Sequence, residues 1–242
     1  SEYPLLLKQH RIDALGQPQI TITKLARHNP LGYKIVTAVV PQFSLSDYKS
    51  IATNINKIPL PPVVIEDKEL ETLLTNIKNH PQTAERSPEQ LKEEATKYLQ
   101  FDKERRQKDK RRLEIIEAID KEIQLILPPV LIETELNKMI AELGSDLKTA
   151  GLEFEAYLKE IKKTAAELRT ELRPQSIKRV RIGLILDRLA EAEHLEPDPE
   201  KIKTETDRLL ATHPDFNPET IKSYIRSVLK NEVVWAWLES QK

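Results

Sequence analysis

The residue types that most often catalyse reactions or bind metals are few in this sequence, and they are widely separated along it. The chain has five histidines and no cysteine, and no two histidines are four residues apart, the spacing of two metal ligands on one helical face. It has no Gly-x-x-x-x-Gly-Lys segment to hold a phosphate and no Gly-x-Ser-x-Gly turn to present a nucleophile. The histidines are His10, His28, His80, His194 and His213. We therefore predict a protein that is not an enzyme and that needs neither a metal nor a cofactor.

A basic run at Asp102–Arg112 suggests a second kind of chemistry, binding to a polyanion. It contains seven basic and three acidic residues, a balance that would suit contacts with the phosphates of RNA. The acidic residues lie four positions from basic ones, as in the ion pairs of a solvated helix face. No aromatic residues interleave to stack on bases. We therefore interpret the run as a solvated face, and RNA binding stays the alternative.

Apolar residues gather near the C-terminus, where Trp235 and Trp237 stand among Val233, Val234 and Leu238. A helix end that docks into a core would have this composition. An exposed surface offered to other polypeptides or to a second copy would have it too. We interpret the cluster as a docked helix end.

The composition favours long helices with charged outer surfaces. Charged residues make up 32% of the chain and aromatic residues 5%, with 5 glycines and 16 prolines, so we expect prolines to mark helix ends rather than to lie inside helices. Basic and acidic residues nearly balance, 38 against 39, which leaves no net field to attract DNA or an anionic membrane. No apolar stretch approaches the roughly 20 residues that cross a bilayer, and we expect no signal peptide at the start of the chain. With no cysteine, we expect a soluble protein of the reducing cytoplasm.

The first 62 residues predict a small mixed unit that contains one hairpin. A hairpin is marginal by itself, so we expect a helix or a third strand to cover it. The expected elements are a helix over Tyr3–Leu15, a break at Gly16–Pro18, a strand through Ile20 and Ile22, a turn at Arg27–Pro30, a strand over Tyr33–Val39 and a proline-rich linker at Ile58–Val63.

From Glu66 onward, apolar residues recur with the helical period. Ser87 and Pro88 form a helix start, with serine as the cap and proline in the first turn. The helices expected are Asp67–Asn79, Ser87–Ile126, Val130–Gly151, Glu153–Ile161, Thr164–Glu193, Pro199–His213 and Pro218–Leu238. The second of these is expected to end in an apolar seam through Ile116, Ile119, Ile123 and Ile126.

Several short motifs succeed one another in a recognisable order. They are Gly16-Gln17-Pro18, Pro41–Lys49, Ile65–Leu70, Leu127–Met139, Gly151–Leu158, Leu168–Arg173 and Arg179–Leu189. Residues Leu131–Met139 fit Leu-x-Glu-x-Glu-Leu-x-x-Met, the opening of a chaperone arm. In this order and spacing the chain resembles the trigger factor family, bacterial chaperones that meet nascent chains at the ribosome.

The resemblance also implies two departures from the usual form of that family. A prolyl isomerase domain of about one hundred residues usually comes after the helix equivalent to Asp67–Asn79, whereas here His80–Arg86 lead directly to the next helix. The ribosome-docking loop of the family would precede residue 1, so we expect the chain to begin midway through the ribosome-binding domain. A ribosome contact would therefore be made by a segment upstream of Ser1.

These observations lead to a fold class and a function. We expect a mainly α protein with a small α+β N-terminal part, residues 1–62, and then an elongated multi-helix chaperone domain with arms, residues 63–242. The resemblance implies an ATP-independent chaperone that binds exposed hydrophobic segments of unfolded or nascent polypeptides, without a cofactor, and that binds neither DNA nor a membrane. The residues predicted to bind these clients are Ile132, Leu136, Met139, Ile140, Leu143, Phe154, Tyr157 and Leu158.

Helical spacing alone does not distinguish a binding crevice from a core, so two alternatives stay open. In the first, the same residues form an ordinary helical core or a homodimer interface of a structural module. In the second, the protein is a periplasmic chaperone like SurA, whose gene would encode a cleaved signal peptide.

Overall fold

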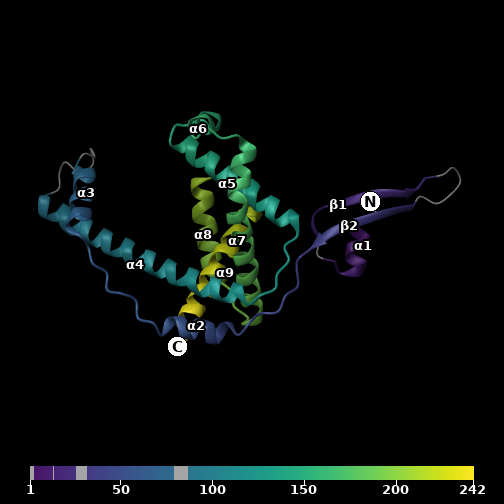
Figure 1. Cartoon of the computed structure of the whole chain (residues 1–242), viewed down its shortest axis with the longest axis horizontal. Coiled ribbons are helices and arrows are strands. Elements are labelled where there is room, and N and C mark those ends of the chain that lie inside the picture. Colours follow the sequence, from purple (N-terminus) through teal and green to yellow (C-terminus); the bar gives the residue numbers. More distant parts are fainter. Residues whose placement is uncertain (1–2, 13, 26–31, 79–86) are drawn as a thin grey trace. The chain divides into compact units, whose positions relative to one another are not determined.

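Most of the residues that the computed structural model describes are helical. The described residues are 3–12, 14–25, 32–78 and 87–242. Their helices are α1 (Tyr3–His10), α2 (Tyr48–Asn56), α3 (Asp67–Lys78), α4 (Pro88–Lys121), α5 (Pro129–Thr149), α6 (Phe154–Glu160), α7 (Ala165–Ala192), α8 (Pro199–Thr212) and α9 (Pro218–Ser240). The strands β1 (Ala14–Lys24) and β2 (Gly32–Val39) pair antiparallel in a small sheet (Figure 1). The prediction of a mainly α protein with a small β part is confirmed.

Helices begin where the sequence places capping side chains. The hydroxyl of Thr164 accepts a hydrogen bond from the Glu167 N–H at the start of α7, and the Glu167 carboxylate accepts one from the Thr164 N–H. Asp198 and Asn217 cap α8 and α9, and a proline comes directly after each. Such side chains satisfy backbone donors that the first helical turn leaves free, and proline fits there because it has no N–H. The predicted starts of these helices are confirmed.

The end of α4 differs from the prediction, since the helix stops at Lys121 and not at Ile126. The next segment is irregular, and the Arg181 guanidinium holds it by donating to the carbonyls of Ile123 at 3.2 Å and Leu125 at 2.8 Å. These carbonyls therefore have partners outside a helix, and Ile126 is 91% exposed. The predicted seam of four isoleucines is wrong as one helical stripe. Its buried members are Ile116, Ile119 and Ile123.

The first helix also stops earlier than predicted. It ends at His10, and β1 begins at Ala14 and runs through the segment Gly16–Pro18 that the sequence marks as a break. The pairing with β2 is irregular over this stretch. Gly16 has a φ of +68°, and Pro18 has no N–H to donate to a ladder, so a bulge accommodates both residues. The predicted break is therefore a bulge within a strand.

The second strand of the hairpin lies where the sequence predicts it, over Tyr33–Val39. The turn predicted at Arg27–Pro30 lies outside the described residues. The Tyr3 hydroxyl of α1 donates a hydrogen bond to the Thr37 hydroxyl of β2 at 2.9 Å, so the short helix contacts the sheet as expected of a marginal hairpin.

One proline contradicts the expectation that prolines mark helix ends. Pro174 lies inside α7, which continues without a break. Its side chain is exposed, and two residues later the hydroxyl of the fully buried Ser176 donates to the Arg173 carbonyl at 2.8 Å. Because proline has no N–H, the Thr170 carbonyl lacks the backbone donor that it would have in a regular helix, and α7 continues through this position despite that loss.

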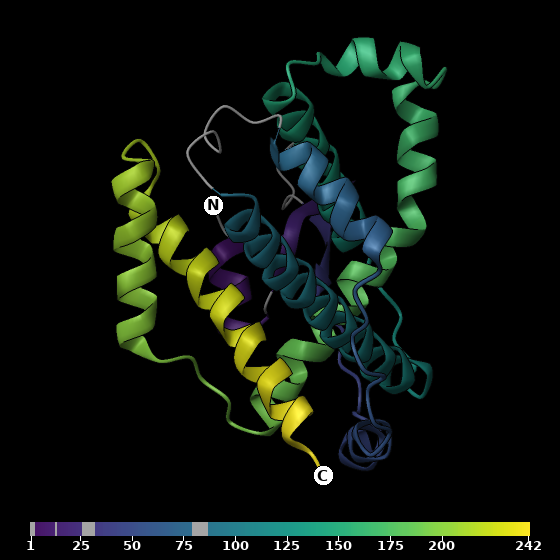
Figure 2. The same ribbon diagram turned by 90° about the vertical axis from the view of Figure 1, so that its left-hand side faces the viewer.

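The chain divides into two compact units, each made of two separate stretches of sequence. Unit 1 comprises Ser1–Leu45 and Glu122–His194, and unit 2 comprises Ser46–Lys121 and Leu195–Lys242. Unit 1 thus contains the hairpin with α5, α6 and α7, and unit 2 contains α2, α3, α4, α8 and α9. Within unit 2, α8 and α9 lie side by side (Figure 2). The domain boundary that the sequence suggests at residue 62 stays a prediction.

The C-terminal helix docks within unit 2 through its last turns. Val234 and Leu238 are fully buried, and the Trp237 ring lies 5.9 Å from the Tyr48 ring of α2. The amide of Asn56, at the end of α2, donates to the Leu238 carbonyl at 2.9 Å and to two further carbonyls at the end of α9. It thereby satisfies acceptors that the last helical turn leaves free. The interpretation of the C-terminal apolar cluster as a docked helix end is confirmed.

Candidate functional site

The eight residues predicted to bind clients all lie on α5 and α6, but they differ in exposure. Four of them are buried: Ile132, Leu136, Met139 and Leu158. The other four are half-buried: Ile140, Leu143, Phe154 and Tyr157. We call this second group the α5–α6 apolar face. Its side chains are accessible to another polypeptide in the structure as it stands, whereas the buried group is not.

The buried residues of α5 belong to its packing with neighbouring helices of unit 1. α5 packs on α7 and on α6, and the spacing of Ile132, Leu136 and Met139 places them on one side of the helix. Leu147 continues this stripe and is 8% exposed. It was not among the residues predicted from the sequence, although its distance of four residues from Leu143 was a signal that would have found it.

Ion pairs also join α5 to α7, and the sequence patterns did not predict them. The carboxylate of Glu133 accepts hydrogen bonds from Arg169 at 2.7 Å and from Arg173 at 2.5 Å. Farther along the two helices, Arg179 donates to Glu142 at 2.9 Å. Arg169 and Arg173 are four residues apart, so one acceptor meets both guanidinium groups on the same helical face. This four-residue spacing could have suggested a shared acidic partner, but it does not identify which acidic residue that partner is.

The ion pairs shift the pKa values of their members. Hydrogen bonds from Arg173 and then from Arg169 lower the pKa of Glu133 below its ordinary value of 4.5. The hydrogen bond to Glu142 raises the pKa of Arg179. Both shifts mean that the folded unit favours the charged forms of these side chains.

Glu133→Gln will remove part of the acid sensitivity of the protein. A carboxyl whose pKa is lower in the folded state stabilises the fold above its unfolded-state value, near 4.5. That contribution is lost as the pH falls through the lowered folded-state pKa. The wild type should therefore exceed the variant in stability at pH 7, and the difference should shrink toward zero as the pH falls below 4.5. Urea unfolding at a series of pH values from 7 to 3 measures this difference.

A matched control for that experiment is Glu155→Gln, which removes an exposed carboxylate from α6. We expect the control to follow the wild type at every pH. A Glu133→Gln variant whose stability difference from the wild type stays constant across the range would contradict the assigned role of Glu133.

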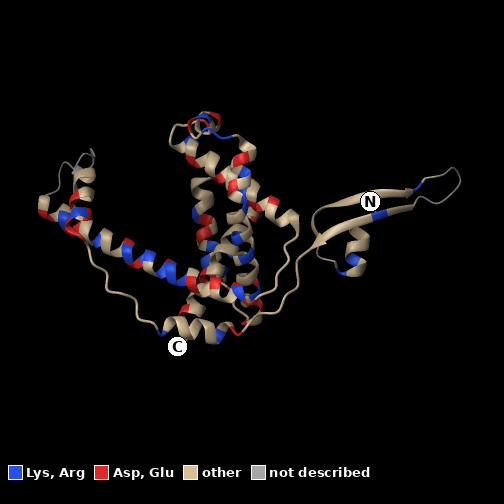
Figure 3. Ribbon diagram, viewed as in Figure 1, with Lys and Arg blue, Asp and Glu red and all other residues tan. Residues whose placement is uncertain are grey.

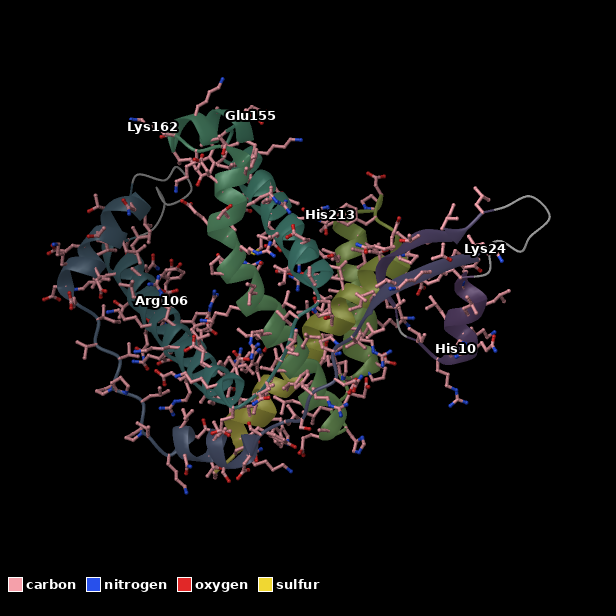
Figure 4. All side chains as sticks on the ribbon, turned by 45° about the vertical axis from the view of Figure 1, so that its right-hand side comes forward. His10, Lys24, Arg106, Glu155, Lys162 and His213 are labelled. Carbon is pink, nitrogen blue, oxygen red and sulfur yellow. The ribbon has the colours of Figure 1, made fainter. Side chains whose placement is uncertain are left out.

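Charged side chains share α6 and its flanks with the apolar face. Figure 4 shows Glu155 on α6, and Lys162 just after it, projecting outward from the ribbon. Lys163 pairs with Glu171 of α7 at 2.7 Å. The half-buried apolar side chains of α6 therefore share this helix and its flanks with charges of both signs.

The basic run Asp102–Arg112 lies on α4, where basic residues succeed one another along the helix (Figure 3). Arg106 pairs with Asp102 at 2.8 Å, and Arg105 lies 3.9 Å from Asp109. Both pairs have the four-residue spacing of a solvated helix face. That interpretation of the run is confirmed for these pairs, and RNA binding stays an untested alternative.

Two hollows lie along α8 and α9, and neither was predicted from the sequence. One has a volume of about 1030 Å³ and combines apolar residues such as Ile202 with Lys222 and Arg226. The other has about 430 Å³ and includes Val228 and Leu229. Both hollows combine apolar and charged linings.

Within residues 3–12, 14–25, 32–78 and 87–242, no three His, Asp or Glu side chains lie together as a metal site requires. The same part of the chain has no helix that is both long and apolar enough to cross a membrane. The described residues do offer the apolar face on α5 and α6 with its charged surroundings.

Comparison with known protein families accounts for nearly the whole chain. Residues 1–77 match the family described as bacterial trigger factor protein, and residues 87–241 match the C-terminus of that protein. Only residues 78–86 separate the two matched stretches. A domain usually needs about 50 residues or more, so the two stretches adjoin with no domain between them.

Individual relatives agree with this assignment. Trigger factor from Caldicellulosiruptor bescii is 30% identical over 121 residues, which are 50% of this chain and 28% of the relative. Trigger factor from Bacillus thuringiensis is 28% identical over 145 residues, which are 60% of this chain and 34% of the relative. The matched part thus spans about a third of the length of these curated relatives.

A solved structure of trigger factor domains from Thermotoga is 18% identical and covers 56% of this chain and 83% of its own, with a TM-score of 0.37. That score is too low to support an argument about the fold. The family descriptions carry the assignment instead, since the C-terminal one alone matches residues 87–241, well over half of the chain. This chain belongs to the trigger factor family.

Proposed function

We propose that this chain is a chaperone that binds exposed hydrophobic segments of unfolded or nascent polypeptides and releases them without ATP. Membership of the trigger factor family supports the chaperone role, and the observation that carries the binding step is the α5–α6 apolar face. Its four side chains are only half-buried, whereas Ile132, Leu136 and Met139 of α5 are buried. Apolar side chains that a fold leaves partly accessible are candidates for contact with another chain.

The chemistry of this face suits weak and reversible binding. Each methylene that is buried contributes about 0.8 kcal/mol, and a micromolar Kd corresponds to about 8 kcal/mol. A few apolar contacts offset by the cost of ordering the client therefore give affinities in this range. No covalent step and no nucleotide is required.

The buried candidates have a different role in this proposal. Leu136 and Met139 are 1% and 6% exposed, so we assign them to the packing of α5 that holds the apolar face in place. For these residues the alternative of an ordinary helical core fits the structure better than a crevice does. A homodimer that covers the face is the competing role for the accessible residues.

The family relationship supports further parts of the proposal. Because residues 78–86 alone join the two matched stretches, we expect no prolyl isomerase activity from this chain. We propose action in the cytoplasm, and we assign contact with the ribosome to no residue of this chain.

An aggregation assay without nucleotide tests the proposal. A chemically denatured client is diluted into buffer with the chain in excess, and light scattering is monitored over time. We expect the chain to slow the rise in scattering, with a dependence on its concentration that saturates. Size-exclusion chromatography at the same concentrations detects a homodimer. Unchanged scattering at a tenfold excess of the chain would reject the proposed function, and a stable dimer with no client binding would favour the structural alternative.

A further inference from the structure

The proline-rich linker between α2 and α3, residues 57–66, lies along α4 and is held there by side chains. α2 and α3 both pack on α4, so the linker is anchored at each end within unit 2. Between these ends, three side chains of α4 donate hydrogen bonds to its backbone carbonyls. The bonds are Lys103 Nζ to the Val64 oxygen at 2.8 Å, Gln107 Nε2 to the Pro61 oxygen at 3.1 Å, and Arg111 Nη2 to the Ile58 oxygen.

The donors and the acceptors are each regularly spaced along their own segments. The donors, which we call the α4 donor row, are Lys103, Gln107 and Arg111. They are four residues apart and therefore share one face of α4. The acceptors are three residues apart in a segment with neither helix nor strand pairing. In the extended conformation that proline favours, every third carbonyl points the same way.

The linker suits this row because each of its ten residues has a carbonyl that can accept, whereas only seven carry a backbone N–H. Three of its residues, at positions 59, 61 and 62, are prolines without an N–H, which disfavours pairing as a strand. Long side chains that end in N–H groups supply the missing partners. These hydrogen bonds recognise the backbone of the bound segment and depend little on its side chains.

Apolar burial contributes little to holding the linker. Ile58 is 61% exposed, Leu60 45% and Val64 67%. Exposed hydrogen bonds contribute only modestly to stability because water competes for the same groups. The linker is therefore held by contacts that a competing segment can replace one for one.

We propose that the α4 donor row is a binding site for the backbone of extended, proline-rich polypeptide, that the linker occupies this site in cis, and that a separate proline-rich chain can displace it. This site lies in unit 2 and is distinct from the α5–α6 apolar face. It does not depend on the proposed function, since it recognises carbonyl groups and not apolar side chains.

The absence of cysteine from the chain allows a direct test. Leu60→Cys in the full chain provides one thiol for a fluorescent dye, whose anisotropy reports how tightly the linker is held. The competing probe is an unlabelled peptide with the sequence of residues 57–66. A second peptide carries serine in place of the three prolines.

We expect the proline-rich peptide to lower the anisotropy of the dye in a saturable way. Half of the change should occur at a concentration on the order of millimolar, because a short tether gives the linker an effective concentration of that order. The serine peptide should need about tenfold more, since it loses the preformed extended conformation. A peptide that leaves the anisotropy unchanged at about ten times the expected midpoint would overturn the proposal.

The triple variant Lys103→Ala, Gln107→Ala, Arg111→Ala should have low anisotropy without peptide and should not respond to it. The matched control is Arg105→Ala with Lys110→Ala, which removes the same number of charges from α4 outside the donor row. This control should behave as the wild type does. A triple variant with wild-type anisotropy would also overturn the proposal. Circular dichroism confirms that the variants are folded, and if the triple variant is not, the peptide titration of the wild-type linker decides.

Discussion

Leu238→Ala will lower the free energy of unfolding by about 2–5 kcal/mol. Leu238 is fully buried near the end of α9, where that helix meets α2 and α4. Truncation removes buried methylene groups and leaves a cavity that close-packed neighbours fill only in part. The same residue offers its carbonyl to Asn56, so a shift of the last turn would loosen that cap as well. Urea unfolding monitored by circular dichroism measures the effect.

The matched control for this prediction is Leu113→Ala on α4. Leu113 is 38% exposed, so the same chemical change there should cost about 1 kcal/mol or less. Trp237 packs against Tyr48, and a blue or red shift of tryptophan emission in Leu238→Ala would report the loosened contact. Equal losses of stability in the two variants would show that α9 does not dock as the structure describes.

Much of the fold was predictable because residues close in sequence determine where many of the helices begin and end. Thr164, Asp198 and Asn217 cap helices in the structure, and each is recognisable from its own type and from the residues directly after it. Gly151, with a φ of +76°, comes after α5 as predicted, because glycine adopts this conformation without strain. At these helix ends, signals that depend on a few neighbouring residues gave correct boundaries.

The error at the end of α4 arose where a distant residue decides the local structure. α4 stops at Lys121, and the segment after it binds the side chain of Arg181, which lies far along the sequence. The sequence after Lys121 retains helical periodicity, so no local pattern predicted that the helix would end there. The α4 donor row could not be predicted for the same reason, because its partner, the linker, lies elsewhere in the sequence. Lys103 and Arg111 look like members of a solvated basic run until the linker is seen beside them.

The candidate site shows a second limit of sequence patterns. Leu136 and Leu143 have the same residue type and lie on the same helix, yet one is 1% exposed and the other is half-buried. Periodicity predicts that both lie on the apolar side of α5. It does not predict where the neighbouring helix stops covering that side, because the cover comes from α6 and α7. Only the packed structure separates the two groups.

The difference between the buried and the half-buried residues leads to the prediction with the largest expected effect on function. Leu143→Glu combined with Tyr157→Glu will weaken client binding by about 10–100-fold. Fully burying one large apolar side chain contributes about 1.5–3 kcal/mol, and a factor of ten in affinity corresponds to about 1.4 kcal/mol. Both residues are only half-buried, so a charge can reach water at each position and the fold should persist. Fluorescence anisotropy of a labelled, permanently unfolded client measures the affinity.

The chain offers a closely matched control for this double variant. Ala141→Glu with Ala156→Glu adds the same charges to the same two helices, at positions that are already exposed. It therefore tests whether charge alone repels a client, and we expect its affinity to stay within about twofold of the wild type. Urea unfolding of both variants shows whether they remain comparably folded. If the two double variants bind the client equally well, the α5–α6 apolar face does not hold it, and the accessible residues of this face are then better explained as an interface with a second copy.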